Sequence, residues 1–278
     1  MDIERILSHL SLEGPTVVDE WSADIEATLG DAFDSIPVVA LDAEGVNLGR
    51  QGQITIVQLA TPAQCFLLDV LHKEPSDPLI GWLRSVLEDP RVVKVIHDCR
   101  MDSDALLHHC GINLVNVHDT SCWHAAITGG RSKNLNDTLM HYDLSPNTIR
   151  NGSVYDRNPA FWATRPLTPQ MIEWAAGDVA AMFTLQERQQ ARASHYATQH
   201  AVQKSEEFVS QPRRFEIGSV TVLNPGRFIG RGGETIRRLQ DRTGTYIYSA
   251  SQRSRNFLVY YDANNKDSFL SVQRAARQ

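Results

Sequence analysis

The sequence predicts an α/β protein: a large domain with a mixed sheet flanked by helices, followed by a small α+β domain. Apolar runs of strand length alternate with segments of helical spacing between residues 36 and 195, which is typical of a sheet covered by helices. The charge then changes sign. Residues 1–212 hold 15 Lys and Arg against 28 Asp and Glu, whereas residues 213–278 hold 12 against 5. This asymmetry indicates two modules, of which the basic one is a candidate for binding nucleic acid.

The composition excludes some classes of protein. No apolar run approaches the roughly 20 residues needed to cross a bilayer. The acidic segment Met1–Arg5 lacks the apolar stretch of a signal peptide, so we expect an intracellular protein, cytoplasmic or nuclear, with no membrane partner. The four cysteines form no C-x-x-C pair. Six His and Cys residues lie between residues 108 and 124, but their spacings fit no common zinc site, so we interpret them as buried thiols and surface histidines.

The first domain is expected to begin with a helix and three strands. Residues 20–30 have the spacing of a short amphipathic helix, and a buried strand follows at 36–43. A β-branched strand at 54–60 forms a hairpin with it, and a third strand covers Cys65–Val70. Beyond this meander the pattern predicts helices at 79–87, 101–109, 119–127 and 134–142, and strands at 92–96 and 114–117.

A long segment without periodicity precedes the last predicted helix of this domain. Residues 143–168 are rich in Asn, Pro, Arg and aromatic side chains, and a loop of this length inside a compact domain is usually functional. Thr168 is placed as the N-cap of a long helix, with Pro169 in its first turn, and this helix is predicted to continue past residue 195. We expect the first domain to span residues 1–200, a polar linker residues 201–214 and the second domain residues 215–278.

The second domain is predicted to have the order β-α-α-β-β-α, with a Gly-rich turn between its first two helices. The apolar runs and turn residues predict a strand at 220–223, a helix that continues from the Gly-rich segment through 237–243, strands at 246–248 and 257–261, and a last helix at 265–277.

Two carboxylates in the first predicted strand are the starting point for the function. Asp42 and Glu44 are separated by one residue, so both side chains point to the same face of a strand. Like charges this close are costly unless a cation holds them, and Mg²⁺ prefers carboxylate oxygens. The alternative for the pair alone is a solvated strand end, and carboxylates from other elements must decide between the two.

Two other places supply such carboxylates. The segment His97-Asp98-Cys99-Arg100-Met101-Asp102 directly follows a second buried strand. Asp178 lies in the middle of the long helix beside Ala175, Ala176 and Gly177, where an acid is costly unless it meets a partner. The alternative for Asp178 is a carboxylate on the helix surface, but the small flanking residues indicate close packing against the sheet.

With these motifs, residues 36 to about 195 resemble the DEDD 3′–5′ exonucleases of the RNase D type, in particular the Egalitarian-like branch. The first motif is Asp42-Ala43-Glu44-Gly45-Val46-Asn47-Leu48-Gly49, and the second ends in Asp102. The third motif, Tyr-x-x-x-Asp in this branch, stands here as Trp174-Ala175-Ala176-Gly177-Asp178. The resemblance implies an RNase H-like (DnaQ-like) exonuclease domain with a mixed sheet flanked by helices.

The resemblance also implies a reaction. Asp42, Glu44, Asp102 and Asp178 would anchor two Mg²⁺ or Mn²⁺ ions that activate a water and stabilise the leaving oxygen at a phosphodiester. The protein would then be a metal-dependent 3′–5′ exoribonuclease that releases nucleoside 5′-monophosphates from the 3′ ends of single-stranded RNA. A DNA 3′–5′ exonuclease is one alternative to this hypothesis.

Trp174 departs from the family pattern at a catalytic position. The family tyrosine orients the attacking water through its hydroxyl, whereas an indole offers one N–H donor and no acceptor. Help of this kind is worth on the order of 10²–10⁴ in rate. Because the four acids that would hold the metal ions are all present, we expect hydrolysis to be weakened rather than abolished. The alternative is a nuclease fold retained as a weak or inactive RNA-binding adaptor.

The basic domain resembles a second family. Ile229-Gly230-Arg231-Gly232-Gly233-Glu234-Thr235-Ile236 is similar to the GxxG loop and following helix of a type I KH domain, which clamps the backbone of single-stranded nucleic acid. This implies that Gly230, Arg231, Gly232 and Gly233 contact RNA, with Arg227 and Arg237 as further contacts. A P-loop is excluded because no Gly-Lys-Ser/Thr follows. The resemblance to Egalitarian-like proteins makes a homodimer or a protein partner plausible.

Overall fold

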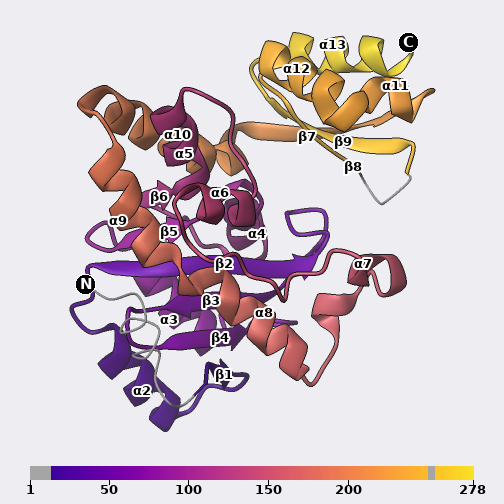
Figure 1. Ribbon diagram of the computed structural model, residues 1–278. Helices are drawn as coiled ribbons and strands as arrows, with labels where there is room; N and C mark the ends of the chain where they lie inside the picture. The colour runs from indigo at the N-terminus through magenta and orange to yellow at the C-terminus, as the bar shows by residue number, and fades with distance from the viewer. Residues whose placement is uncertain (1–13, 250–253) are drawn as a thin grey trace. The chain divides into compact units, whose positions relative to one another are not determined.

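The computed structural model describes residues 14–249 and 254–278 (Figure 1). The chain divides into two compact units, with the division after Val209. The start of the first predicted domain, residues 1–13, lies outside the described residues, as does the segment 250–253. None of the helices that the structure describes is long and apolar enough to cross a membrane.

The first unit contains the predicted mixed sheet. Its six strands have the order β1-β4-β3-β2-β5-β6. Strands β2, β3 and β4 form an antiparallel meander, whereas β1, β5 and β6 join it in parallel pairs. The strands are β1 (Thr16–Val18), β2 (Val38–Val46), β3 (Gln53–Ala60), β4 (Cys65–Asp69), β5 (Val93–Ile96) and β6 (Val117–Asp119).

Five helices of the first unit agree with the predicted segments, and most of them have a capping residue that is visible in the sequence. Ser22, Asp77 and Asn134 each accept a backbone N–H of the first turn, and Gly111 ends a helix in the left-handed conformation at φ 64°. These helices are α2 (Ala23–Phe33), α3 (Pro78–Leu87), α4 (Arg100–Cys110), α5 (Thr120–Thr128) and α6 (Leu135–His141).

The predicted long helix after Thr168 is divided into two helices, and the second ends at Arg192, short of the predicted end past residue 195. α8 (Pro169–Ala180) and α9 (Met182–Arg192) cross in front of the sheet in Figure 1. The break falls at Ala181, whose φ of −95° and ψ of 0° end α8. The apolar pattern does not reveal the break, because Val179, Met182 and Leu185 pack into one core with Val95 of β5.

Helix α10 (His195–Arg214) contains the residues that we predicted as the linker. Most of its buried positions are small or polar: Ala197, Ala201 and Ser205 lie one turn apart, and Phe208 is the large apolar side chain buried after them. The Ser205 hydroxyl accepts the backbone N–H of Asp119 at 3.3 Å. Because most of this face is small or polar, it gives only a weak hydrophobic signal in the sequence.

Three other predicted segments of the first unit differ from the structure. The last strand was placed at 114–117 but covers Val117–Asp119, since Asn116 takes a left-handed φ of 51° that interrupts extended backbone. The first strand continues to Val46, beyond its predicted end. The predicted loop at 143–168 contains two short helices, α7 (Val154–Arg157) and η1 (Phe161–Ala163).

The second unit has the predicted order β-α-α-β-β-α. Its antiparallel sheet has the order β7-β9-β8. Its first strand lies earlier than predicted, and the helix after the Gly-rich turn spans Glu234–Thr243. The elements are β7 (Phe215–Thr221), α11 (Pro225–Ile229), η2 (Arg231–Gly233), α12 (Glu234–Thr243), β8 (Tyr246–Ser249), β9 (Asn256–Asp262) and α13 (Lys266–Ala276).

Candidate active site

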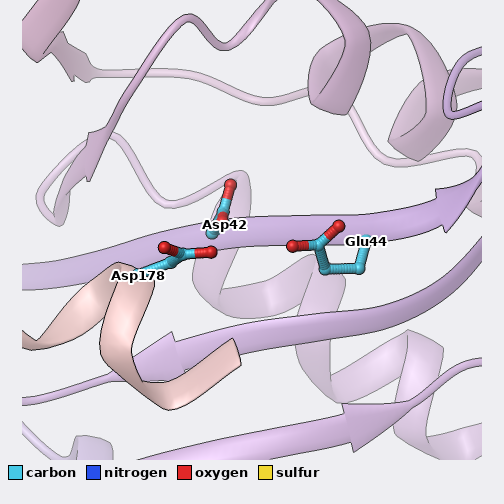
Figure 2. A group of neighbouring side chains, drawn as sticks. All are labelled: Asp42, Glu44 and Asp178. Carbon is cyan, nitrogen blue, oxygen red and sulfur yellow. The ribbon is translucent and has the colours of Figure 1, made fainter. Parts of the chain in front are cut away.

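Three carboxylates from two elements meet on one face of the sheet. Asp42 and Glu44 extend from β2, and Asp178 approaches them from α8 (Figure 2). One oxygen of each lies within 4.8 Å of the others. We call Asp42, Glu44 and Asp178 the acidic cluster. The pair on β2 lies within the strand rather than at its end, because β3 continues to pair with β2 as far as Val46.

Asp102 lies beside this cluster and has a different contact. Strand β5 pairs with β2 only as far as Ala40, so the next part of that β2 edge lacks a strand partner. The Ala43 backbone N–H in this part donates to Asp102 Oδ1 at 3.1 Å. Asp102 is not one of the three carboxylates that meet within 4.8 Å. Burial, and to a smaller extent the charge of Asp42, nevertheless raise the pKa of Asp102 well above its usual range.

The neighbouring acids of the second motif are already paired. Asp98 accepts two hydrogen bonds from the Arg100 guanidinium, at 2.5 and 2.6 Å. Asp104 accepts the Arg50 backbone N–H at 2.6 Å and its Nε at 2.8 Å. Among these three acids, Asp102 is therefore the one whose carboxylate is directed at the strand that carries the acidic cluster.

Asp178 is held through one of its two oxygens. Oδ1 accepts Nδ2 of Asn147 at 2.9 Å and lies 3.3 Å from Nη1 of Arg150. Oδ2 is buried and has no hydrogen-bond partner among the described residues. A buried carboxylate oxygen without a partner is costly, so Oδ2 is available to a ligand such as a cation.

The electrostatics of the acidic cluster fit a divalent cation. Burial, followed by the charge of Asp178, raises the pKa of Asp42 to about 7. Burial and the charge of Asp42 raise the pKa of Glu44 well above its usual range, and burial raises that of Asp178. Arg150 opposes these shifts but does not cancel them. All the donors are oxygens, which suits Mg²⁺ or Mn²⁺.

Trp174 lies one helical turn before Asp178 and is 2% exposed. Its ring packs against those of Trp162 and Tyr155, with centroids 5.4 and 6.1 Å away. Trp162 Nε1 donates to the Tyr155 hydroxyl at 2.9 Å. Trp174 Nε1 has no partner at hydrogen-bond distance among the described residues, although its N–H helps to lower the pKa of Asp178 against the effect of burial.

Gly177 gives Asn147 the space to reach α8. A Cβ at Gly177 would lie 2.6 Å from Asn147 Nδ2, the atom that donates to Asp178 Oδ1 and to the Trp174 carbonyl. We expect Gly177→Ala to lower the free energy of unfolding by about 1–3 kcal/mol, because Asn147 must move and leave polar groups unpaired. Urea unfolding followed by circular dichroism measures this.

Gly81→Ala is the matched control for this variant. Gly81 also lies inside a helix, α3, but a Cβ there would meet no atom within 4 Å. That substitution should raise the free energy of unfolding by about 0.5–1 kcal/mol, because glycine is a poor helix former. Equal effects of the two substitutions would contradict the role given to Gly177.

A cavity of about 780 Å³ adjoins the acidic cluster at Asp42. Its wall comes from the segment after β5, from the start of α6 and from the loop that follows α6. The residues that line it include His97, Asp98, Lys133, Asn134, Asn136, Asp137 and Arg150. The His and Cys residues between 108 and 124 take no part, and no group of three of them meets as metal ligands within the described chain.

The Gly-rich turn of the second unit connects α11 to α12. Gly230, Gly232 and Gly233 all have positive φ, at 76°, 58° and 75°. A Cβ at Gly230 would lie 2.1 Å from the Thr235 hydroxyl, so this position requires glycine. Arg237 Nη2 donates to the Gly232 carbonyl, which places this guanidinium beside the turn.

Arg227 has different surroundings from the Gly-rich turn. Its Nη1 donates to the Gln278 carbonyl at 3.2 Å. It also lines a cavity of about 270 Å³, whose lining includes Arg238 and Arg242 but no residue from 230 to 233. Of the two arginines expected to assist the turn, the structure therefore brings Arg237 to it and not Arg227.

Comparison with known proteins agrees with this geometry. Residues 22–191, more than half of the chain, match the 3′–5′ exonuclease family. The chain belongs to this 3′–5′ exonuclease family. Residues 225–263 match the KH domain, and the predicted resemblance to both families is confirmed.

The relatives of this exonuclease-family chain are longer proteins. It is 32% identical to the piRNA biogenesis protein EXD1 of Mus musculus over 183 residues, which cover 61% of the chain and 32% of that protein. It is 30% identical to the Egalitarian protein homolog of Caenorhabditis elegans over 147 residues, which cover 48% of the chain and 25% of that protein. The chain thus spans between a quarter and about a third of their lengths.

A solved structure supports the fold of this exonuclease-family chain. RNase D of Trypanosoma brucei in complex with RNA U12 matches it with a TM-score of 0.60 and 23% identity. The match covers 74% of the chain and 72% of the solved one. At this level of identity the likeness establishes the fold alone.

Proposed function

We propose that this protein is a metal-dependent 3′–5′ exoribonuclease that shortens single-stranded RNA and releases nucleoside 5′-monophosphates. The observation that carries the proposal is the acidic cluster with its unpartnered Asp178 Oδ2. Three carboxylates at this spacing, with raised pKa values and one oxygen that has no hydrogen-bond partner among the described residues, form a site for hard divalent cations. Membership of the 3′–5′ exonuclease family supports the reaction class.

Each residue of the site has a defined task in this proposal. Asp42, Glu44 and Asp178 would hold the Mg²⁺ or Mn²⁺ ions, with Asp102 as the fourth acid. Bound ions would lower the pKa of a water and neutralise charge that develops on the phosphate oxygens. Asp102 orders the free edge of β2 through Ala43, and Asn147 orients Asp178 through Oδ1.

Trp174 sets the efficiency of this reaction. The indole is buried one helical turn before Asp178. It can donate one N–H toward the Asp178 carboxylate, but it offers no hydroxyl to accept and donate protons. We therefore propose a site that binds metal and hydrolyses RNA more slowly than one with tyrosine at this position.

The KH domain would bind the RNA strand. Gly230, Arg231, Gly232 and Gly233 would contact its backbone, with Arg237 beside them. RNA is favoured over DNA as substrate because the chain joins a KH domain to a domain similar to RNase D, whose solved structure contains RNA.

Shortening of a 5′-labelled RNA in Mn²⁺ tests the proposal. We expect a ladder of products that become shorter from the 3′ end, and none with Asp42→Ala. That variant should still bind the RNA, because its KH residues are unchanged. Equal shortening by both proteins would show a contaminating nuclease and reject the proposal, whereas preferential shortening of a DNA strand of the same sequence would favour the DNA exonuclease.

Trp174 also supports a second candidate function. A protein with this fold and a KH domain but no water-orienting hydroxyl could serve as an RNA-binding adaptor without hydrolysis. The absence of shortening by a protein that binds both metal and RNA would favour this candidate.

A further inference from the structure

Arg150 connects the acidic cluster to the adjoining cavity. Its Nη1 lies 3.3 Å from Asp178 Oδ1, whose side chain is fully buried, yet the Arg150 side chain is 39% exposed. It lines the same cavity of about 780 Å³ as Asp42. A guanidinium has five N–H donors, and within the described residues only this bond to Asp178 uses them.

We propose that Arg150 binds the phosphate group of the 3′-terminal nucleotide in this cavity. The inference rests on the proposed function and adds a substrate-binding residue to it. Three carboxylates repel a phosphate, so an anionic substrate needs a cationic group beside the metal ions. A planar guanidinium suits this task because it can donate two parallel hydrogen bonds to phosphate oxygens while remaining charged.

The backbone before Arg150 is held in place for such a task. Asn136 of α6 exchanges two hydrogen bonds with the Asn147 backbone, at 2.9 and 3.0 Å. The Asn147 side chain accepts the Ile149 N–H and donates to Asp178. The loop is thus tied to α6 and to α8 immediately before Arg150, which limits the backbone entropy lost when this residue binds a ligand.

The competing role for Arg150 is to neutralise the acids without touching substrate. Its charge does lower the pKa values of Asp42 and Glu44, against the larger effect of burial. A neutralising residue would influence metal affinity, whereas a phosphate-binding residue would influence nucleotide affinity at saturating metal. Its partial exposure and its place in the cavity wall favour contact with phosphate.

Calorimetric titration of the full chain with uridine 5′-monophosphate in saturating Mg²⁺ tests the inference. We expect Arg150→Ala to weaken binding at least about tenfold, and Arg150→Lys to recover part of the loss because it keeps the charge. Uridine, which lacks the phosphate, should bind all three proteins equally weakly. Arg157→Ala is the matched control, because Arg157 is exposed on the same loop and does not line the cavity.

The possible results distinguish phosphate binding by Arg150 from neutralisation of the acidic cluster. Unchanged nucleotide affinity in Arg150→Ala, with altered affinity for Mn²⁺ alone, would assign Arg150 to neutralisation and overturn the inference. An equal loss with uridine would also overturn it, because the contact would not involve phosphate. A wild-type protein that neither binds the nucleotide nor shortens RNA would reject the proposed function together with this inference.

Discussion

Trp174→Tyr is expected to raise the rate of RNA shortening by on the order of 10²-fold. A tyrosine at this position would bring a hydroxyl, which can accept and donate a proton, to the turn of α8 that precedes Asp178. The residues that would hold metal are unchanged by the substitution, so the gain should appear in the rate at saturating Mn²⁺ and not in metal affinity.

Trp174→Phe is the control for this experiment. Phenylalanine and tyrosine remove nearly the same volume from the cluster of Trp174, Trp162 and Tyr155, but only tyrosine adds a hydroxyl. Both variants should lose a similar amount of stability, on the order of 1–3 kcal/mol. Single-turnover rates and thermal unfolding of both variants then separate the chemical effect from the packing effect.

This comparison also separates the two candidate functions. Equal rates for the tyrosine and phenylalanine variants would show that the site does not use a hydroxyl here. If neither variant nor the wild type shortens RNA although all bind Mn²⁺, the adaptor becomes the better account of the protein.

Much of the fold could be predicted because its signals are local. The strands of the meander are apolar runs with β-branched residues, and the capping residues Ser22, Asp77 and Asn134 precede their helices directly. The predicted helix boundaries are wrong where two consecutive helices share one apolar pattern, or where the buried face of a helix has few large apolar residues. The apolar pattern that spans α8 and α9 continues across Ala181, and the buried face of α10 is mostly small or polar.

The residues of the candidate site also differ in how well the sequence predicts them. Asp42, Glu44 and Asp178 could be found because two of them share a strand face and the third stands among small residues. The sequence does not single out Asn147 and Arg150. They lie 31 and 28 positions before Asp178 in the sequence, in a loop with no periodicity that would show their contact with it. The length of that loop and its many Asn and Arg residues are the signals in the sequence. Gly177 indicates close packing without revealing that Asn147 fills the space.

A divalent cation is expected to stabilise the protein much more at about pH 8 than at about pH 5. The pKa of Asp42 is about 7 in the folded protein, whereas the usual value, which applies to the unfolded chain, is 3.8. Between these values Asp42 binds more protons in the folded state, so the contribution of this group to the stability of the metal-free protein falls as pH rises and is smallest above pH 7. A cation bound by the deprotonated acids removes this penalty and stabilises the folded state further.

Asp42→Asn should separate the penalty of the charged cluster in the metal-free protein from the stabilisation by a bound cation, in a thermal unfolding experiment. An amide of the same shape removes the cost of burying the Asp42 charge and its repulsion with Asp178 and Glu44. The metal-free variant should therefore melt above the wild type at about pH 8, by roughly 2–4 °C per kcal/mol gained. The same variant should lose the shift caused by Mg²⁺ or Mn²⁺, because a cluster oxygen and its charge are missing. Asp137→Asn, in the cavity wall but outside the cluster, should keep the shift. A wild-type melting temperature that does not respond to either cation at about pH 8 would show that the acidic cluster is not a metal site, since carboxylates with raised pKa values must gain stability from any cation that they bind.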